Sequence, residues 1–406
     1  TNVETLSISG GEQNDRIRGG AAGDSFSGGA GDDILEGRDG ADNLSGGDGD
    51  DTLDGGAGND TLTMGLGNDT AYGGDGNDWI YMTWDQNSRV LANGGAGTDG
   101  IVIQGQGSWV GGVWTVGAMH VDLAAAQAAN RLTLESIENI YVYGGSSADV
   151  LSGTAVRDNL NGDEGDDLLI GSGGSDVLQG GAGNDVLVGG TGGDFLYGGD
   201  GYDIAVYEGA VRGYNMTTST MVQAGREGGT DSLSAVETLA FVDGQLTFHR
   251  DGIAAQVMRL YDSAFNRIPD ASGFEAQLDA MEGGLSLNAL AQLFVESVEF
   301  QNTYGALNDR QFVEQMYRNV LNREGDTAGI NNAVNELLSG KSRGEVLVAF
   351  SESTEHKNLT QGTLDQGLWI ADDQTLIIAR LYDAAWNRLP DEGGLITWRN
   401  ALGGGT

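Results

Sequence analysis

Sixteen aspartates recur at a fixed place in a nine-residue repeat, where their carboxylates could bind metal ions. Residues 10–81 form eight consecutive nonapeptides, one isolated copy begins at Gly94, and residues 144–206 form seven more. The sixth position of every copy is aspartate, namely Asp15, Asp24, Asp33, Asp42, Asp51, Asp60, Asp69, Asp78, Asp99, Asp149, Asp158, Asp167, Asp176, Asp185, Asp194 and Asp203. If successive copies stack, these carboxylates lie close together and repel one another unless cations lie between them.

The residues around each aspartate predict a turn followed by a short strand. Glycine at the first, second and fourth positions permits backbone angles that other residues resist. In the two arrays the eighth position is Ile17, Phe26, Leu35, Leu44, Leu53, Leu62, Ala71 and Ile80, then Leu151, Leu160, Leu169, Leu178, Leu187, Leu196 and Ala205. Two copies make one coil, so alternate copies stack in one sheet and their eighth residues fill the interior.

Stacking also sets the strength of the repulsion between aspartates. Asp15 would lie over Asp33 at about one strand spacing, ~4.8 Å, where two bare carboxylates repel by roughly 1–4 kcal/mol. A stack of such pairs needs a counter-cation, and carboxylates combined with turn carbonyls suit Ca²⁺ better than Mg²⁺. The alternative, an acidic glycine-rich coil without metal, does not explain why leucine and aspartate stay in phase along residues 10–81.

The pattern G-G-x-G-x-D-x-U-x resembles the RTX nonapeptide of calcium-binding parallel β-rolls. "GGAGDDILE" (28–36), "GGDGDDTLD" (46–54), "GGDGNDWIY" (73–81) and "GGAGNDVLV" (180–188) match it fully. The resemblance implies that one Ca²⁺ is enclosed by the aspartates and backbone carbonyls of two stacked turns. By this resemblance, one ion would lie between Gly29, Gly31 and Asp33 of one turn and Gly46, Asp48 and Asp51 of another. A second ion would lie between Gly47, Gly49 and Asp51 and the residues Met64, Leu66 and Asp69. Further carbonyl ligands are implied at Gly55, Ala57, Gly73, Asp75, Gly180, Ala182, Gly198 and Asp200.

The number of stacked pairs predicts the number of ions. Pairs two copies apart number six in the array of eight and five in the array of seven, so about eleven Ca²⁺ ions are expected if each pair binds one. Met64 replaces the first glycine of its copy and still offers a carbonyl, so only the turn geometry is in question. The imperfect turns at Ala22, Arg38, Thr154 and Ser172 are expected to bind weakly or only to stack.

Composition limits the classes of function. The chain has 406 residues, with 70 Gly, 2 Pro, no Cys and a formal net charge of -40. This acidity argues against a nucleic-acid partner, the absence of cysteine excludes disulfides, and no apolar run is long enough to span a membrane. The first residue is Thr1 and no signal peptide is present, so a processed or truncated chain is expected.

The predicted fold is mainly β with an α-helical C-terminal part. Its expected parts are a first RTX β-roll (1–102), a connecting β segment (103–143), a second β-roll (144–206), a β capping segment (207–250) and a helical repeat domain (251–406). In the second roll, outward positions such as Val150, Leu168, Val186 and Ile204 predict an apolar sheet face. Either the flanking chain (103–143 or 207–248) covers this face, or it is a subunit interface.

A second repeat follows the nonapeptides, with apolar residues at helical spacing. "YDSAFNRIPDASG" (261–273), "YRNVLNREGDTAG" (317–329) and "YDAAWNRLPDEGG" (382–394) share the frame Y-x4-N-R-x2-D-x2-G. Each copy predicts a helix ending at Asn-Arg, a turn held by the arginine and aspartate, and a second helix capped by that aspartate. The frame resembles helical repeats of unknown function that accompany RTX arrays in secreted bacterial surface proteins, and more distantly phycobilisome linkers. The third unit is incomplete, so the native chain is expected to continue.

No catalytic constellation was found in the sequence. It has no H-E-x-x-H, nucleophile elbow or P-loop, and His120, His249 and His356 lie in separate segments. The absence of these motifs predicts a non-enzymatic protein. The RTX resemblance implies a secreted calcium-binding protein, a surface-layer, filament, matrix or adhesin subunit at the cell surface of a Gram-negative bacterium, exported by type I secretion. The alternative is the non-catalytic part of a larger secreted enzyme or toxin.

Two kinds of partner are expected from the sequence. Self-association would use the apolar face of the second roll or the helical repeats. A cell-surface polysaccharide is a weaker candidate, suggested by the aromatic residues Trp79, Tyr81 and Trp84.

Overall fold

The computed structural model describes residues 5–371, apart from 86, 106, 111–112, 117–118, 208, 218–219, 224–227 and 242. The chain divides into two compact units, Thr1–Val236 and Glu237–Thr406. The expected capping segment, 207–250, therefore contributes residues to both units. The third copy of the helical frame, at 382–394, lies outside the described residues.

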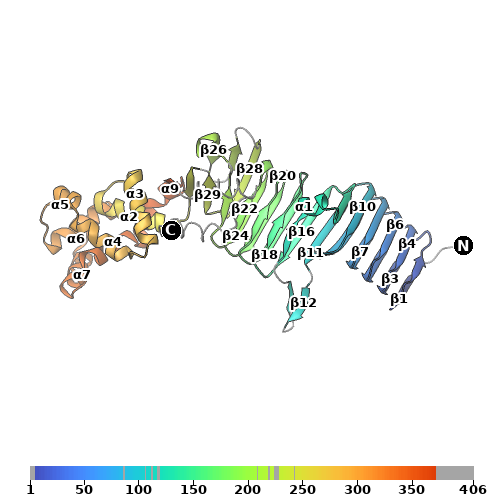
Figure 1. The fold of residues 1–406 in the computed structure, drawn as a ribbon. Helices are drawn as coiled ribbons and strands as arrows, with labels where there is room; N and C mark the ends of the chain where they lie inside the picture. Colours follow the sequence, from blue (N-terminus) through green and yellow to red (C-terminus); the bar gives the residue numbers. More distant parts are fainter. Residues whose placement is uncertain are drawn as a thin grey trace, which may run out of the picture. The chain divides into compact units, whose positions relative to one another are not determined.

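The first unit is a parallel β-solenoid of about ten turns over residues 7–205, which confirms the predicted β-roll architecture. The strands of one wall stack as a continuous sheet (Figure 1). In spatial order they are β1 (Ser7–Gly11), β3 (Ser25–Ala30), β5 (Asn43–Asp48), β7 (Thr61–Leu66), β9 (Trp79–Trp84), β11 (Gly100–Gly105), β16 (Asn139–Gly145), β18 (Asp158–Glu164), β21 (Val177–Ala182), β24 (Phe195–Asp200), β28 (Gly229–Ser234), β27 (Thr220–Gln223) and β26 (Tyr214–Thr217). Both nonapeptide arrays thus contribute to a single sheet.

The opposite wall of the solenoid consists of two separate stacks of strands. Over the first array the order is β15 (Leu132–Glu135), β10 (Val90–Ala96), β8 (Thr70–Asp75), β6 (Thr52–Ala57), β4 (Ile34–Asp39) and β2 (Arg16–Arg18). Over the second array it is β14 (His120–Asp122), β17 (Val150–Ser152), β19 (Leu168–Ile170), β22 (Val186–Val188) and β25 (Ile204–Val206). The break between the two stacks falls in the segment that joins the arrays.

Alternation within each strand produces the core of the solenoid. In β5 and β7, Leu44 pairs in register with Leu62, and both side chains are fully buried. Every other eighth-position side chain of the two arrays is buried as well. Each turn therefore contributes one inward side chain from each wall, and neighbouring turns bury each other's apolar surface.

Close contact between turns requires glycine at their sharpest points. Gly58 has φ 141°, and a β carbon there would overlap the carbonyl oxygen of Gly40 in the preceding turn. Two of the imperfect turns keep the left-handed backbone without glycine, since Arg38 has φ 87° and Ser172 has φ 76°. The stacked geometry therefore extends through those turns.

Residues 103–143 extend the solenoid and shift its repeat. In the wall formed by the continuous sheet, Tyr81 pairs with Val102 and Val102 with Tyr141. Tyr141 then pairs with Asn159, which holds the seventh position of its copy, whereas Tyr81 holds the ninth. The same segment contains the hairpin β12 (Gly107–Val110) and β13 (Val113–Val116), and helix α1 (Leu123–Ala128). The two arrays are thus joined with a two-residue offset.

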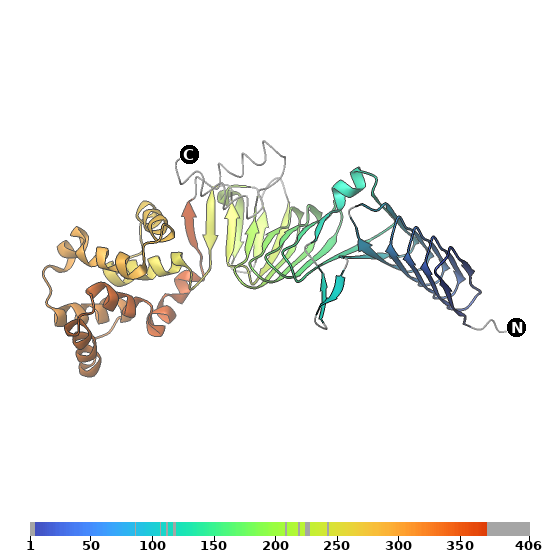
Figure 2. The same cartoon turned by 60° about the horizontal axis from the view of Figure 1, so that its bottom comes forward.

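The second unit contains the helices of the C-terminal part and an antiparallel set of strands (Figure 2). The helices are α2 (Ile253–Phe265), α3 (Ala271–Glu282), α4 (Leu287–Glu296), α5 (Val298–Tyr304), α6 (Asp309–Leu321), α7 (Thr327–Leu338), α8 (Arg343–Ser351) and α9 (Thr354–Leu364). Strands β29 (Thr238–Phe241), β30 (Gly244–Thr247) and β31 (Leu368–Ala371) pair in that order. Apolar side chains of the helices form one buried cluster, which includes Phe294 and Phe312.

Local geometry explains the asparagine and the aspartate of the repeated helical frame. Asn266 ends α2 in the left-handed conformation at φ 53°, and Asp270 caps α3 by accepting the amide of Gly273 at 2.9 Å. The second copy repeats both features at Asn322 and Asp326. Helix termination and capping, rather than catalysis, account for these residues.

The arginine of the frame has a different partner from the one expected. Arg267 lies 3.9 Å from Asp270 but donates to Glu299 at 2.9 Å, and its guanidinium covers the Tyr261 ring. Arg323 likewise pairs with Glu355. In each copy the arginine therefore forms its ion pair with a glutamate of a later helix, α5 or α9. The aspartate carboxylate is already used as a helix cap.

An ion pair with a buried arginine joins α2 to the C-terminal end of α8. Arg259, which is fully buried, donates to both carboxylate oxygens of Glu352 at 2.8 and 2.6 Å. Replacing Glu352→Ala is expected to lower the unfolding free energy of this unit by about 3 kcal/mol, because the guanidinium would remain buried without its counter-charge. Thermal unfolding followed by helical circular dichroism measures the change.

The matched control is Glu355→Ala, which removes an exposed glutamate from its pair with Arg323. Little change is expected there, because solvent already screens that pair. Equal destabilisation by the two substitutions would contradict a special role for the buried pair.

Candidate metal centre

The repeat aspartates form ladders in which each carboxylate binds the backbone of a neighbouring turn. Oδ1 of Asp51 accepts the amide of Asp33 at 2.8 Å, and Oδ1 of Asp69 accepts the amide of Asp51 at 2.9 Å. Corresponding bonds of 2.6–2.9 Å run through both arrays. In these residues the first carboxylate oxygen therefore ties the turns together, and Asp158 is an exception because its Oδ1 has no hydrogen-bond partner.

Each repeat aspartate forms one rung of a ladder. At most rungs the second carboxylate oxygen is buried without a hydrogen-bond donor. Among the described residues, this holds for Oδ2 of Asp33, Asp42, Asp51, Asp60, Asp78, Asp99, Asp149, Asp167, Asp176 and Asp194. A buried carboxylate oxygen without a partner is costly, because water no longer solvates its charge. These oxygens are therefore the atoms that a bound cation would satisfy.

Burial also raises the pKa of the repeat aspartates. The pKa values of Asp51 and Asp167 both rise to about 7, mainly because burial disfavours the charged form. Repulsion from the stacked carboxylates raises them further. For Asp176 the same causes raise the pKa to about 8. These carboxylates lose their protons readily near neutral pH only if a positive charge lies beside them.

Backbone carbonyls gather beside the second aspartate oxygens. The carbonyl of Gly73 lies 2.6 Å from where a β carbon of Gly55 would be, and Oδ2 of Asp60 approaches the same point. The carbonyl of Met64 lies 2.6 Å from the corresponding point at Gly46, beside Oδ2 of Asp51. Met64 thus presents its carbonyl as the glycines do, despite its side chain.

The third-position carbonyls of the expected ligand set also face the neighbouring turn. The carbonyls of Asp48, Ala57 and Asp75 accept the amides of Gly31, Gly40 and Gly58 at 2.7–2.8 Å. In the second array, the carbonyls of Ala182 and Asp200 accept the amides of Gly165 and Gly183. Each of these oxygens keeps a second lone pair that could bind a cation.

This donor set fits Ca²⁺ and does not fit zinc. Carboxylate and carbonyl oxygens in a flexible turn are the ligands that Ca²⁺ prefers. Within the described residues, no group of three or more His, Cys, Asp or Glu side chains could hold a metal ion by itself. Backbone carbonyls must therefore complete any site, and Ca²⁺ would supply the positive charge that the paired carboxylates need.

Two rungs depart from this arrangement. Oδ2 of Asp24 accepts the amide of Gly20 at 2.8 Å, and Oδ2 of Asp158 accepts both the amide and the hydroxyl of Thr154. These rungs belong to the imperfect turns that contain Ala22 and Thr154. Their Oδ2 atoms therefore already have donors in the protein, although Oδ1 of Asp158 is buried without a hydrogen-bond partner. Weak binding at those turns stays a prediction.

The structure adds two carboxylates that the repeat pattern missed. Glu138 accepts the amide of Asp99 through Oε2 at 2.8 Å, and Asp231 accepts the amide of Asp194 through Oδ1 at 2.9 Å. Each is followed two residues later by an apolar residue, Ile140 or Leu233, like the sixth and eighth positions of a nonapeptide. That short spacing was the signal available in the sequence.

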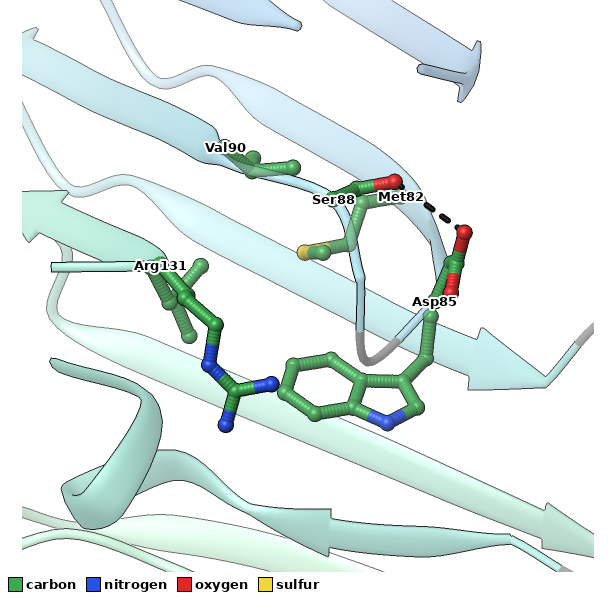
Figure 3. Close-up of a pocket in the computed structure, with 7 residues that line it drawn as sticks. Met82, Asp85, Ser88, Val90 and Arg131 are labelled. Carbon is green, nitrogen blue, oxygen red and sulfur yellow. Dashed lines mark hydrogen bonds between the residues drawn. The ribbon is translucent and has the colours of Figure 1, made fainter. Parts of the chain in front are cut away.

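A small cavity near the end of β9 is too small for a ligand. It has a volume of about 10 Å³ and is lined by Met82, Trp84, Asp85, Ser88, Val90, Arg131 and Leu132 (Figure 3). A volume of this size holds roughly one water molecule. The indole of Trp84 donates to the carbonyl of His120 at 3.0 Å, so Trp84 belongs to this corner and not to an open aromatic surface.

Comparison with known families agrees with the geometry of both units. The RTX calcium-binding nonapeptide repeat (4 copies) matches residues 7–35, 27–62, 36–71, 65–81, 143–178 and 170–205. A domain of unknown function, DUF4214, matches residues 291–360. No curated protein matches the chain. The chain thus carries RTX repeats, which bind Ca²⁺ and are typical of secreted proteins, followed by a DUF4214 domain.

Proposed function

We propose that the chain is a secreted structural protein that folds and self-assembles on extracellular Ca²⁺. It would serve as a surface-layer, filament, matrix or adhesin subunit of a Gram-negative bacterium and leave the cell by type I secretion. The ladder of buried carboxylate oxygens without donors carries this proposal, because it makes the folded solenoid depend on Ca²⁺. No helix among the described residues is long and apolar enough to span a membrane.

An apolar face on the second array supports self-association. Val150, Leu168, Val186 and Ile204 lie in register on neighbouring strands, and all four are half-buried. The part of this apolar surface that remains exposed favours contact with another protein surface. Bound Ca²⁺ would also lower the mutual repulsion of copies that each carry a net charge of -40.

Replacing Leu168→Asp tests the apolar face. In millimolar Ca²⁺ the wild-type chain is expected to assemble, whereas the variant should remain largely monomeric because a charge then lies at the centre of the face. Analytical ultracentrifugation with and without chelator measures assembly, and circular dichroism shows whether the variant still folds. Thr70→Asp, at the equivalent position on β8 of the first array, is the control and should assemble normally.

A wild-type chain that stays monomeric at every Ca²⁺ concentration would contradict the proposal. That result would favour the second candidate, the non-catalytic part of a larger secreted enzyme or toxin. RTX β-rolls are typically non-catalytic, and the proposal extends this property to the whole chain.

A further inference from the structure

Three adjacent rows of outward side chains on one face of the solenoid carry no charge, although one-fifth of the residues in the chain are charged. On the continuous sheet, the row Ser9, Ser27, Ser45, Thr63, Tyr81 and Val102 runs across successive strands in register. The row continues through Tyr141 and Asn159 to Phe195, and the two rows beside it also consist of Ser, Thr, Asn, Gln, Gly and aromatic residues. We call these three rows the neutral face. Exposed carboxylates such as Asp48 and Asp163 lie beyond the rows, toward the ends of their strands.

The opposite wall is charged over the first array, whereas its strands over the second array carry the apolar face described above. Outward positions of β2, β4 and β6 include Arg18, Glu36 and Asp54, and Arg18 pairs with Glu36. Both walls are built from the same repeat with the same freedom at outward positions. The repeat therefore permits charge at outward positions, and the neutral face lacks it over both arrays.

Aromatic and amide side chains gather at one end of the neutral face. Tyr143, Phe195 and Tyr197 are 43%, 43% and 41% exposed, and Asn161 and Gln179 lie in register between the two tyrosines. A shallow cavity of about 100 Å³ opens over β16, β18 and β21, which are consecutive neighbours in the continuous sheet. The amides can each donate and accept hydrogen bonds there.

A second aromatic platform is built next to this cavity. Gly100 lies between Trp79 and Asn139 in register, and a β carbon at Gly100 would come within 2.7 Å of the Trp79 ring. The indole therefore lies across Gly100, with its ring centroid 5.6 Å from that of Tyr141. Gly100 has no left-handed backbone angle, so the glycine serves to make room for the ring.

We propose that the neutral face binds an uncharged polysaccharide, with Tyr143, Asn161, Gln179 and Tyr197 as its central subsite. The C–H faces of sugar rings pack on exposed aromatic rings, and sugar hydroxyls exchange hydrogen bonds with amides. Three strand spacings separate the two tyrosines, or ~14 Å, so the ligand must be a chain of sugars. An anionic polymer is disfavoured, because the chain carries a net charge of -40 and the face has no cation.

Affinity electrophoresis of the full chain in millimolar Ca²⁺ tests this proposal. Gels would contain hydroxyethyl cellulose, laminarin, dextran or galactomannan as neutral probes, and carboxymethyl cellulose as the anionic counterpart of the first. Retardation by at least one neutral probe is expected, with none by carboxymethyl cellulose. The double substitution Tyr143→Ala and Tyr197→Ala should weaken retardation at least tenfold, and Gln179→Glu should weaken it while preserving the fold.

The matched control is Tyr72→Ala, which removes a 42% exposed tyrosine from the opposite wall and should leave retardation unchanged. No retardation by any neutral probe, or equal loss in the Tyr72 variant, would overturn the proposal. A change in the sedimentation of the double variant without polysaccharide would identify the neutral face as an interface between copies and would also overturn it. The apolar face of the second array belongs to the other wall, so failure of self-assembly leaves this test intact.

Discussion

In chelator, the nonapeptide region is expected to lose its strand structure, whereas the helices of the second unit persist. Without bound cations, the buried aspartate oxygens keep neither donors nor counter-charge, and stacked carboxylates repel across the interior of each ladder. The helices contain no nonapeptide and have their own apolar core, so they provide an internal reference. Far-ultraviolet circular dichroism during a Ca²⁺ titration measures both signals.

The strand signal should appear at roughly 10⁻⁴–10⁻³ M Ca²⁺, the range of extracellular calcium modules. Magnesium at the same concentration is the control, and it should restore little structure because it keeps its waters and demands tighter geometry. A full strand signal in chelator would refute the coupling of folding to ion binding.

Replacing Asp60→Asn is expected to raise the Ca²⁺ concentration needed for folding by about tenfold, equivalent to ~1.4 kcal/mol. Asp60 accepts the amide of Asp42 through Oδ1 at 2.7 Å, while its Oδ2 is buried without a donor. Asparagine keeps one oxygen for the bond to Asp42 but replaces the other with an amino group that cannot bind a cation. Metal binding is therefore lost while the stacking bond is retained, and the same titration measures the shift.

The control for this substitution is Asp75→Asn in the neighbouring turn. The side chain of Asp75 is exposed, and only its carbonyl faces the preceding turn, where it accepts the amide of Gly58 at 2.7 Å. No shift of the titration is expected. A shift as large as that of Asp60→Asn would show that general loss of negative charge, and not loss of a ligand, controls folding.

Much of the solenoid could be predicted from the sequence because each turn contacts mainly its neighbours. With a constant separation of 18 residues between stacked positions, the bond from Asp33 to Asp51 repeats at Asp42 and Asp60. The apolar eighth position and the aspartate ladder follow from that spacing alone. The β-roll, the helical C-terminal part and the RTX resemblance are confirmed.

The tertiary structure decided what happens where the spacing is irregular. The rung after Asp78 lies 21 residues away at Asp99, the next lies 39 residues away at Glu138, and Asp194 bonds Asp231 across 37 residues. Insertions of unequal length break the constant 18-residue separation from which stacked positions are predicted. For that reason the nine-residue period did not place the two added carboxylates or the offset at Tyr141.

The helical unit shows the same division on a smaller scale. Asn266 and Asp270 were placed correctly from the sequence, because helix ends and caps depend on residues a few positions apart. The pairing of Arg267 with Glu299 spans 32 residues and depends on how the helices pack. The sequence by itself thus determined the repeating turn, its aspartate oxygens and its helix caps, since these depend on local spacing. Only the tertiary structure decided which distant carboxylates complete the ladders and which uncharged rows form one face across both arrays, since those depend on where separated segments meet.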